Sequence, residues 1–561
     1  MTTFGQIHSK TKSLLCILLL FPLALLSIWP KNKFSQVDNF DRDKSFDWDK
    51  VPLDYAEPGG FKAAIALLRI PAKNKKNYRG PILFNPGGPG GSGVELINSR
   101  GKDFQQLIGD EFDIVGFDPR GVSATTPAVS AFSDNIERAY WTAGTPSVSN
   151  STPETFELAF ARNKIQSELI MSQMGNVLEH IGTAAVARDM LAITEAFGQE
   201  KLNYWGFSYG SILGSTFSFM FPDKVGRVVI DGVVEYTAYY SGTSGEALSD
   251  TDKILTYIYN ECVTAGEDCP LYAETPSKVE ERLHTILQSL KSKPMAVFDG
   301  TNYGIIDYGV TKRAFFQGLH SPFASVGPIF KAFAALEEGN ATLMMQMVNH
   351  HRFFEPATCT SEPTVAPKEV AEGRQAIKCG DNYCDGDGNC RNTTIESLKN
   401  DLEEMSRLSI FADVFLDLTS MTCVGWTVPT REKYGGQFNT TTSFPLLIIG
   451  NTYDPVTPLY GARAAAKAFS NSVLMVVDTP GHCSTAGTSP SAMKYIRDYF
   501  REGKLPPKGT ICPITNKLFG KEGMDLTLKN RNGEDEGWLE LVNKFASGAQ
   551  EYQAANMYQA H

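Results

Sequence analysis

The chain has 561 residues, of which 42% are hydrophobic and 20% are charged, and its formal net charge is -11 at pH 7. This length exceeds that of one small domain and suits a large core with an added region. The acidic balance excludes a typical nucleic-acid-binding protein, because such a protein needs a basic face to neutralise phosphates.

The first element predicted from the sequence is an apolar segment at residues 13–29, with lysines on both sides of it. Its length lies between that of a signal-peptide core and that of a full membrane span. We therefore expect residues 1–30 to be a signal anchor or a cleaved signal peptide, with a buried core helix as the alternative. The charged residues 31–50 would form a stalk, and the only expected membrane contact is through the uncleaved segment.

Cysteine spacing and glycosylation sequons place the rest of the chain in the secretory pathway or outside the cell. Cys262 and Cys269 form one close pair, and Cys384 and Cys390 form another. Such spacings favour short disulfide loops in an oxidising compartment. Sequons of the type N-x-[ST] are compatible with this compartment, although each is weak evidence alone. They occur at Asn150, Asn340, Asn392 and Asn439.

No metal site is predicted, because the chain has no CxxC motif and no cluster of cysteine and histidine. One segment has the ligand spacing of a calcium loop, with Cys390 where that loop requires glycine. Its candidate ligands are Asp385, Asp387, Asn389 and Glu396. A polar disulfide hairpin is the favoured interpretation of this segment.

Apolar runs that alternate with helical patterns predict the fold class. Strand-like runs occur at 63–70, 81–85, 112–117, 202–207, 225–230, 444–449 and 472–477, and residues 183–197 have helical periodicity. Strands separated by helices predict an α/β fold with a doubly wound, mostly parallel sheet. We expect the core to be divided between 51–235 and 431–512, with a helical, cysteine-containing cap at 236–430. The polar tail at 513–561 has no predicted structure.

The sequence Gly206-Phe207-Ser208-Tyr209-Gly210 matches the G-x-S-x-G nucleophile elbow. This elbow places a serine on a sharp turn between a strand and a helix, where side chains at the flanking positions would clash. The motif alone could occur by chance, but here a strand-like run precedes it and a helix-like run follows it. Ser208 is therefore the predicted nucleophile.

A glycine-rich segment, residues 85–93, follows the strand-like run at 81–85. Glycines allow backbone N–H groups to approach a ligand closely. In a hydrolase such a loop supplies one donor of the oxyanion hole, and the residue after the nucleophile supplies the other. We therefore expect Gly87 or Gly88, together with Tyr209, at the oxyanion hole. A phosphate-binding loop and a purely structural turn are the alternatives, although the segment lacks the Lys-[ST] ending of a P-loop.

The serine needs a base, and His482 follows the last strand-like run, at 472–477. The acid should precede the histidine in the chain and follow the preceding strand. Asp454 meets this requirement, and a carboxylate there would orient the imidazole and stabilise its protonated form. Asp478 is the competing acid, but it lies only a few residues before the histidine.

Taken together, the motifs resemble those of the tripeptidyl/prolyl aminopeptidase group of α/β-hydrolases. The segments that carry this resemblance are NPGGPGGSG, FDPRGVSATTP, TAAVARDMLAI, LNYWGFSYGSILG, NTYDPVTP and GHC. The resemblance covers about 50–235 and 420–512 and is weak in the cap. It implies Ser208 as nucleophile, Asp454 as acid and His482 as base. Pro86 stands where prolyl aminopeptidases have histidine, which favours the tripeptidyl branch.

Two further disulfides are expected from the oxidising compartment. Cys483 beside the catalytic histidine would pair with Cys512, and Cys379 would pair with Cys423. The first of these bonds would tie the histidine loop to the tail.

The function that we expect is acyl transfer from short peptides through an acyl-enzyme, without a cofactor. An exopeptidase must also bind the free α-ammonium of its substrate, and Glu235 and Glu246 are candidates for that contact. The alternatives are an esterase or lipase with the same triad, and a catalytically inactive hydrolase fold that acts as a binding module. Composition does not indicate the oligomeric state.

Overall fold

The computed structural model describes residues 51–152, 154–243, 246–300, 303–349, 370–384, 390–520 and 536–557, all of which belong to the unit Asp47–His561. The apolar segment at 13–29, the expected stalk, and Asp385, Asp387 and Asn389 lie outside these residues. None of the helices in the described ranges is long and apolar enough to cross a membrane.

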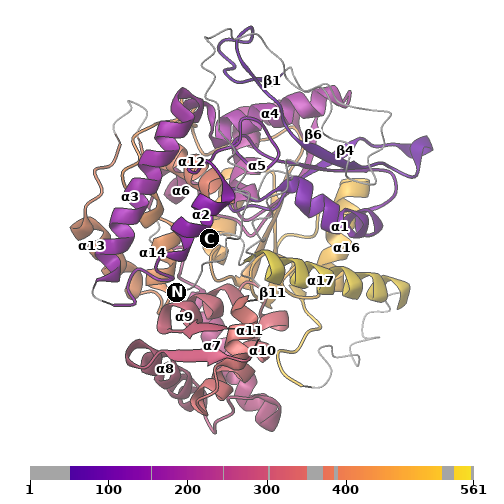
Figure 1. Ribbon diagram of the computed structural model, residues 1–561. Helices are drawn as coiled ribbons and strands as arrows, with labels where there is room; N and C mark the ends of the chain where they lie inside the picture. Colours follow the sequence, from indigo (N-terminus) through magenta and orange to yellow (C-terminus); the bar gives the residue numbers. More distant parts are fainter. Residues whose placement is uncertain are drawn as a thin grey trace, which may run out of the picture. The chain divides into compact units, whose positions relative to one another are not determined.

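The central element is an eight-stranded sheet with the strand order β12-β11-β10-β7-β6-β4-β5-β3 (Figure 1). Every neighbouring pair is parallel except β3 and β5, which are antiparallel. The strands are β3 (Leu67–Ile70), β4 (Pro81–Asn85), β5 (Asp113–Phe117), β6 (Leu202–Phe207), β7 (Val225–Asp231), β10 (Leu447–Tyr453), β11 (Val473–Pro480) and β12 (Ile511–Pro513). The predicted doubly wound, mostly parallel sheet is confirmed.

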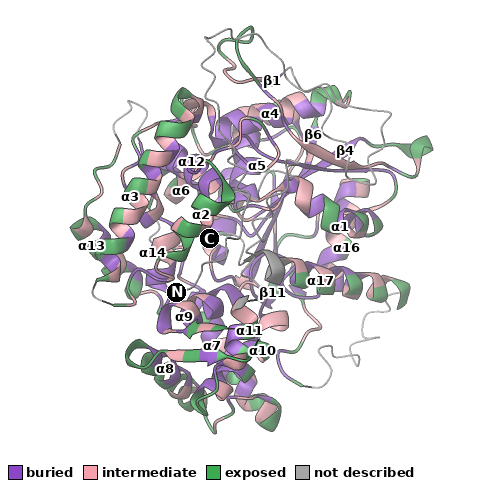
Figure 2. Ribbon diagram, viewed as in Figure 1, coloured by how far each residue is buried: buried purple, intermediate pink, exposed green. Residues whose placement is uncertain are grey.

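Alternate residues of the central strands pack against two different helical layers. Ile82 and Phe84 of β4 lie in a cluster with α1, α16 and α17, whereas Leu83 lies in a cluster with α4, α5 and α15. Strands buried on both faces explain the continuous apolar runs in the sequence. The helices are α1 (Gly93–Ile108), α16 (Pro490–Glu502), α17 (Glu536–Met557), α4 (Thr183–Ala196), α5 (Tyr209–Met220) and α15 (Leu459–Ala468). Figure 2 shows the buried strands between these layers.

The tail, whose structure the sequence did not predict, contributes α17 to this core. Val542 and Phe545 of α17 are buried, and the Phe545 ring lies edge-on to Phe104 of α1 with 5.4 Å between ring centroids. Arg100 of α1 donates a hydrogen bond of 2.7 Å to the Phe545 carbonyl oxygen. The helix therefore packs against the sheet layer through one apolar face.

A second hydrophobic cluster joins most of the elements between β7 and β10, and the three disulfides of the described chain lie within 262–423. The elements in this cluster are α7 (Thr251–Ala265), α8 (Pro276–Ser292), β8 (Met295–Phe298), β9 (Tyr303–Ile306), α9 (Tyr308–Gly318), α10 (Pro322–Glu337), α11 (Thr342–Asn349), α13 (Ile395–Ser406) and α14 (Ala412–Leu418). The two other helices of the cap, α6 (Tyr236–Ser241) and α12 (Val370–Asn382), pack with the sheet in the cluster that contains α4, α5 and α15. Helices α2 (Asn135–Ala143) and α3 (Thr155–Met174) are inserted between β5 and α4, and Phe156 and Ala159 of α3 join the second cluster. A short ladder of β1 (Val51–Pro52) and β2 (Lys62–Ala63) precedes the main sheet.

Three predicted disulfides are present in the structure. They join Cys262 to Cys269, Cys379 to Cys423, and Cys384 to Cys390.

Candidate active site

Ser208 lies on a strained turn between β6 and α5. Its backbone has φ 57° and ψ -122°, a conformation that is rare for residues other than glycine. The Ser208 N–H donates a 2.9 Å hydrogen bond to the carbonyl oxygen of Asp231, at the end of the neighbouring strand β7. The turn is thus fixed by the sheet, and it presents the serine at the carboxyl ends of the strands.

The glycines of the elbow are required because their neighbours are too close for a side chain. A Cβ atom at Gly206 would lie 2.3 Å from the carbonyl oxygen of Gly210. A Cβ atom at Gly210 would lie 2.8 Å from the carbonyl oxygen of Asn85, the last residue of β4. The G-x-S-x-G pattern therefore has a steric cause in this fold.

The glycine-rich loop after β4 lies directly against Ser208. A Cβ atom at Gly87 would lie 2.8 Å from the Ser208 Cβ atom and 3.1 Å from the Tyr209 amide nitrogen. The Gly87 N–H already donates to Asn85 Oδ1 at 2.9 Å. Of the two glycines considered from the sequence, Gly88 is therefore the better oxyanion donor, while Gly87 permits the close approach.

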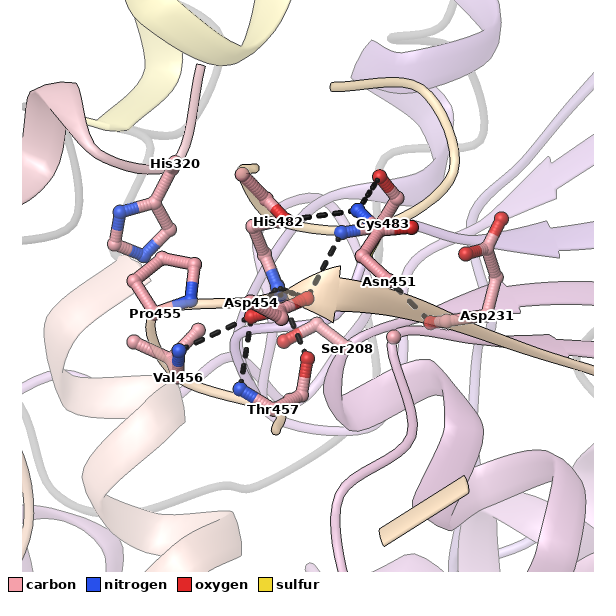
Figure 3. A network of polar contacts seen from close by, with 12 residues as sticks. Ser208, Asp231, His320, Asn451, Asp454, Pro455, Val456, Thr457, His482 and Cys483 are labelled. Carbon is pink, nitrogen blue, oxygen red and sulfur yellow. Dashed lines mark hydrogen bonds and ion pairs between the residues drawn. The ribbon is translucent and has the colours of Figure 1, made fainter. Parts of the chain in front are cut away.

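Asp454 and His482 lie together at the ends of β10 and β11 (Figure 3). The Nδ1 atom of His482 is 2.9 Å from Asp454 Oδ2 and 3.0 Å from Oδ1. The amides of Val456 and Thr457 donate to Asp454 Oδ1 at 3.0 and 2.9 Å. Asp478 is exposed and accepts a hydrogen bond from Thr452 instead. The structure thus pairs the histidine with Asp454.

The environment of Asp454 keeps its carboxylate ionised although it is fully buried. Burial by itself raises the pKa, but the neighbouring His482 and the Val456 and Thr457 amides outweigh this effect, so the pKa lies below its usual value. An ionised acceptor on Nδ1 fixes the imidazole tautomer that leaves Nε2 as the basic nitrogen.

Asp231 is a site residue that sequence reasoning missed. Its buried carboxylate accepts hydrogen bonds from the Ser484 N–H at 2.8 Å, the Ser484 hydroxyl at 2.5 Å and Trp205 Nε1 at 3.2 Å. Because its carbonyl also binds the Ser208 N–H, Asp231 joins the histidine loop to the elbow. Burial raises its pKa to about 6. The available signal was an aspartate directly after an apolar strand and before Gly232.

Two further residues fix the loop that carries His482. Asn451 Nδ2 donates to the carbonyl oxygens of Gly481 and Cys483 at 2.7 and 2.6 Å. From the cap, the carbonyl oxygen of His320 accepts the His482 N–H at 2.9 Å, and the two imidazole rings lie edge to face at 5.4 Å. Burial lowers the pKa of His320 to about 4, with the nearby His482 adding to the effect.

The expected disulfide between Cys483 and Cys512 is wrong, because both cysteines are free and buried. Cys512 lies on β12, opposite Val477 of β11. The thiol of Cys483 instead contacts β7, where it donates to the Asp231 carbonyl oxygen at 3.5 Å. In the strand order, β7 and β12 lie on opposite sides of β11, so the Cys483 thiol is hydrogen-bonded on the side of β11 away from the strand that carries Cys512.

A cavity of about 440 Å³ lies between the sheet ends and the cap. Ser208, Tyr209, Gly87, Gly88 and His482 all line it. Apolar walls with a few polar groups are typical of a small-molecule site.

The two glutamates considered for the substrate ammonium lie in different places. Glu235 lines the cavity, and its carboxylate accepts the N–H groups of Thr237 at 3.1 Å and Ala238 at 2.6 Å, so that it caps α6. Glu246 is exposed and is not among the lining residues. The structure therefore does not support Glu246 as a substrate contact.

The remaining site candidates lie away from this cavity. The sequon asparagines Asn150, Asn340, Asn392 and Asn439 are all exposed. Glu396 lies in the first turn of α13. In the ranges that the structure describes, no group of three or more histidine, cysteine, aspartate and glutamate side chains could hold a metal ion.

Comparisons with known proteins agree with this arrangement. A family model described as TAP-like protein matches residues 409–512, and one described as alpha/beta hydrolase fold matches residues 80–265. The chain is 28% identical over 469 residues to serine protease Hip1 of Mycobacterium tuberculosis, covering 82% of this chain and 86% of that protein. It is 24% identical over 474 residues to a tripeptidyl aminopeptidase of Streptomyces lividans, covering 82% of each chain. It is 25% identical over 472 residues to carboxylesterase B of Mycobacterium tuberculosis, covering 82% of this chain and 85% of that protein.

The resemblance predicted from the order of the motifs is thus confirmed in both halves of the core: the chain has an α/β-hydrolase fold, and residues 409–512 match a TAP-like protein family model.

Proposed function

We propose that this protein is a serine aminopeptidase that releases short peptides or single residues from free peptide N-termini through an acyl-enzyme. The observation that carries the proposal is the convergence of Ser208 and the His482–Asp454 pair on one cavity at the strand ends. The similarity to a serine protease and to a tripeptidyl aminopeptidase supports peptides as the substrates.

In the proposed reaction, the Ser208 hydroxyl oxygen attacks the peptide carbonyl carbon while His482 Nε2 accepts the hydroxyl proton. The buried Asp454 carboxylate stabilises the imidazolium that forms. His482 then gives this proton to the leaving amine, and the C–N bond breaks. A water molecule, activated by the same imidazole, hydrolyses the ester and restores the Ser208 hydroxyl.

The negative charge on the carbonyl oxygen requires fixed donors that need not reorganise during the reaction. We assign this role to the backbone N–H groups of Gly88 and Tyr209. Tyr209 begins α5, so the positive end of a helix dipole adds to its effect. Gly87 keeps the loop close enough to Ser208 for both donors to act on one oxygen atom.

Recognition of a free N-terminus is assigned to Glu235. A carboxylate offers about four lone-pair positions. Two of its contacts are with the amides of Thr237 and Ala238, which leaves capacity for an ammonium in the cavity. Because both Glu235 and Ser208 line the cavity, one short peptide can reach both.

We further propose that the body works outside the reducing cytoplasm, anchored by or released from residues 1–30. The three disulfides support this location, since such bonds persist in oxidising compartments. The exposed sequon asparagines would be open to glycosylation in a host that performs it.

The test uses the body produced in a secretory host, with tripeptide and proline amides as substrates, each with a free or an acetylated N-terminus. A p-nitrophenyl ester is measured in parallel, and Ser208→Ala is the control. Turnover of the free peptides, lost on acetylation and lost in Ser208→Ala, is the expected result. Turnover of the ester alone would contradict the peptidase proposal.

The second candidate function is that of a carboxylesterase, which the similarity to carboxylesterase B favours. The same triad and oxyanion donors would serve an ester. The ester arm of the experiment distinguishes the two functions, and a complete lack of turnover and of covalent labelling would indicate an inactive binding module.

A further inference from the structure

Part of the wall of the active-site cavity is formed by α12. Three of its residues line the cavity at intervals of one helical turn: Arg374, Lys378 and Asn382. Residues four apart lie on the same face of a helix, roughly 6 Å apart along its axis. The two basic side chains therefore form a cationic stripe on the cap side of the cavity that also holds Ser208. Figure 1 shows the position of α12.

Lys378 is the member of this stripe whose charge is least compensated. It is half-buried, and the charged neighbour that acts on it is another cation, Arg374. Burial and this neighbour together lower the pKa of Lys378 to about 7. Burial likewise lowers the pKa of Arg374 to about 10, with Arg313 adding to the effect. Cations at positions i and i+4 repel each other, and enclosed charges require compensation.

The contacts of Lys378 compensate only part of this charge. Its Nζ atom donates a 3.2 Å hydrogen bond to the carbonyl oxygen of Leu418, the last residue of α14. An ammonium has three donors. No ion pair joins Lys378 to a carboxylate among the described residues. The carboxylate of Asp401, which also lines the cavity, is bound by Ser420.

From this arrangement we infer that the cap side of the cavity is a subsite for a carboxylate of the substrate, bound by Lys378 and Arg374. The inference rests on the proposed function, because the same cavity holds the nucleophile. The carboxylate belongs either to an acidic side chain of the peptide or to the free C-terminus of a very short peptide. With Glu235 on α6, the cavity would then offer opposite charges to the two ends of a zwitterionic peptide.

The first measurement is binding, which does not depend on turnover. In the Ser208→Ala background, calorimetry compares peptides that carry Glu or Gln at each position, and peptides with a free acid or an amide at the C-terminus. If a charge-assisted contact forms, then in at least one of these pairs the peptide with the carboxylate should bind at least about ten-fold more tightly than its neutral partner. Preference for the Glu peptides identifies a side-chain carboxylate, and preference for the free acid identifies the C-terminus.

Substitution then tests whether the cations cause the preference. Lys378→Met should bring the ratio of the affinities for the acidic and the neutral peptide close to one. Lys378→Arg should retain most of the preference for the acidic peptide. Lys331→Met is the matched control, since Lys331 is exposed on α10 and is not a lining residue, and it should keep the full ratio. Thermal unfolding of each variant shows that the fold is intact.

If the protein with Lys378 intact binds the acidic and the neutral peptide of every pair equally, the inference is overturned. Lys378 would then serve only to cap the end of α14. Retention of the preference in Lys378→Met would overturn the inference as well. If the proposed peptidase function is wrong, the protein with Ser208 intact will not hydrolyse peptides. This result is independent of the binding data.

Discussion

The residues proposed for chemistry lie at the ends of parallel strands, whereas the residues proposed for substrate selection lie on helices between β7 and β10. Ser208, Asp454 and Asp231 each follow or end a strand, and backbone hydrogen bonds fix them. Lys378 and Arg374 lie on α12, which the Cys379–Cys423 disulfide holds and whose Ala376 and Ile377 pack against the core. On the proposed function, residues at the strand ends would carry out the reaction and residues of the cap would select the substrate. Changes in the two regions should therefore have different signatures.

The largest effect is expected for Asp454→Asn. An amide cannot stabilise the imidazolium and favours the wrong tautomer of His482, so kcat should fall by about 10⁴-fold. KM should change little, because the cavity wall is unaltered. Steady-state kinetics on the best peptide or ester substrate measures both constants. A fall of less than ten-fold would show that another group orients His482.

Removal of the Cys379–Cys423 disulfide should affect the cap rather than the chemistry. The bond closes a loop with a sequence separation of 44, and the chain-entropy model predicts a loss of about 4 kcal/mol in the free energy of unfolding. Because Cys423 lines the cavity, the double alanine variant should raise KM more than it lowers kcat. Denaturant titration and steady-state kinetics measure the two effects. A fall in kcat without a rise in KM would contradict the proposal that the cap affects substrate binding and the strand ends affect the chemistry.

Asp231→Asn should change how stability depends on pH. Burial raises the folded-state pKa of Asp231 to about 6, whereas an aspartate in the unfolded chain has a pKa of about 4, so the folded protein binds more protons between these two pH values. Its contribution to stability is therefore full below pH ~4 and is lost as pH rises through about 6, by about 3 kcal/mol. The variant lacks this dependence.

Urea denaturation at pH 4 and pH 7 tests this difference between wild type and Asp231→Asn. The stability of the wild type relative to the variant should decrease between the two pH values. If the stability difference between wild type and variant is the same at both pH values, Asp231 has its ordinary pKa. That result would contradict the role of a buried Asp231 carboxylate in joining the elbow to the histidine loop.

The smallest effect is expected for Asp478→Asn. This residue is exposed, lies close to His482 in the sequence and accepts a hydrogen bond from the Thr452 hydroxyl at 2.8 Å. Exposed substitutions without buried partners change stability by less than about 0.5 kcal/mol. Neither kcat nor the pH dependence of unfolding should differ from wild type. A large fall in kcat would indicate that Asp478, rather than Asp454, is the acid of the triad.

The core could be predicted from the sequence because its elements are determined by residues close together in the chain. Apolar strands, the glycines around Ser208 and the order of Asp454 and His482 each have a short-range signature. Asp231 was missed because its partner, Ser484, is distant in sequence and only strand order brings the two together. The Cys483–Cys512 pairing failed for a related reason, since the direction of a thiol depends on which strand neighbours it.

The cap and tail were less predictable because their contacts are long-range. The stripe on α12 becomes visible only when the helix is placed against the cavity, since Arg374 and Lys378 resemble ordinary surface residues in the sequence. The helix α17 buries Phe545 against α1 although the tail is polar on average.

Covalent labelling tests the central claim, that Ser208 is the nucleophile, most directly. The protein is treated with a fluorophosphonate, digested, and mapped by mass spectrometry, with Ser208→Ala and Asp478→Asn treated in parallel. The account predicts one adduct on the peptide that contains Ser208, present in the Asp478→Asn variant and absent from Ser208→Ala. An adduct on another residue, or unchanged labelling of Ser208→Ala, would contradict it.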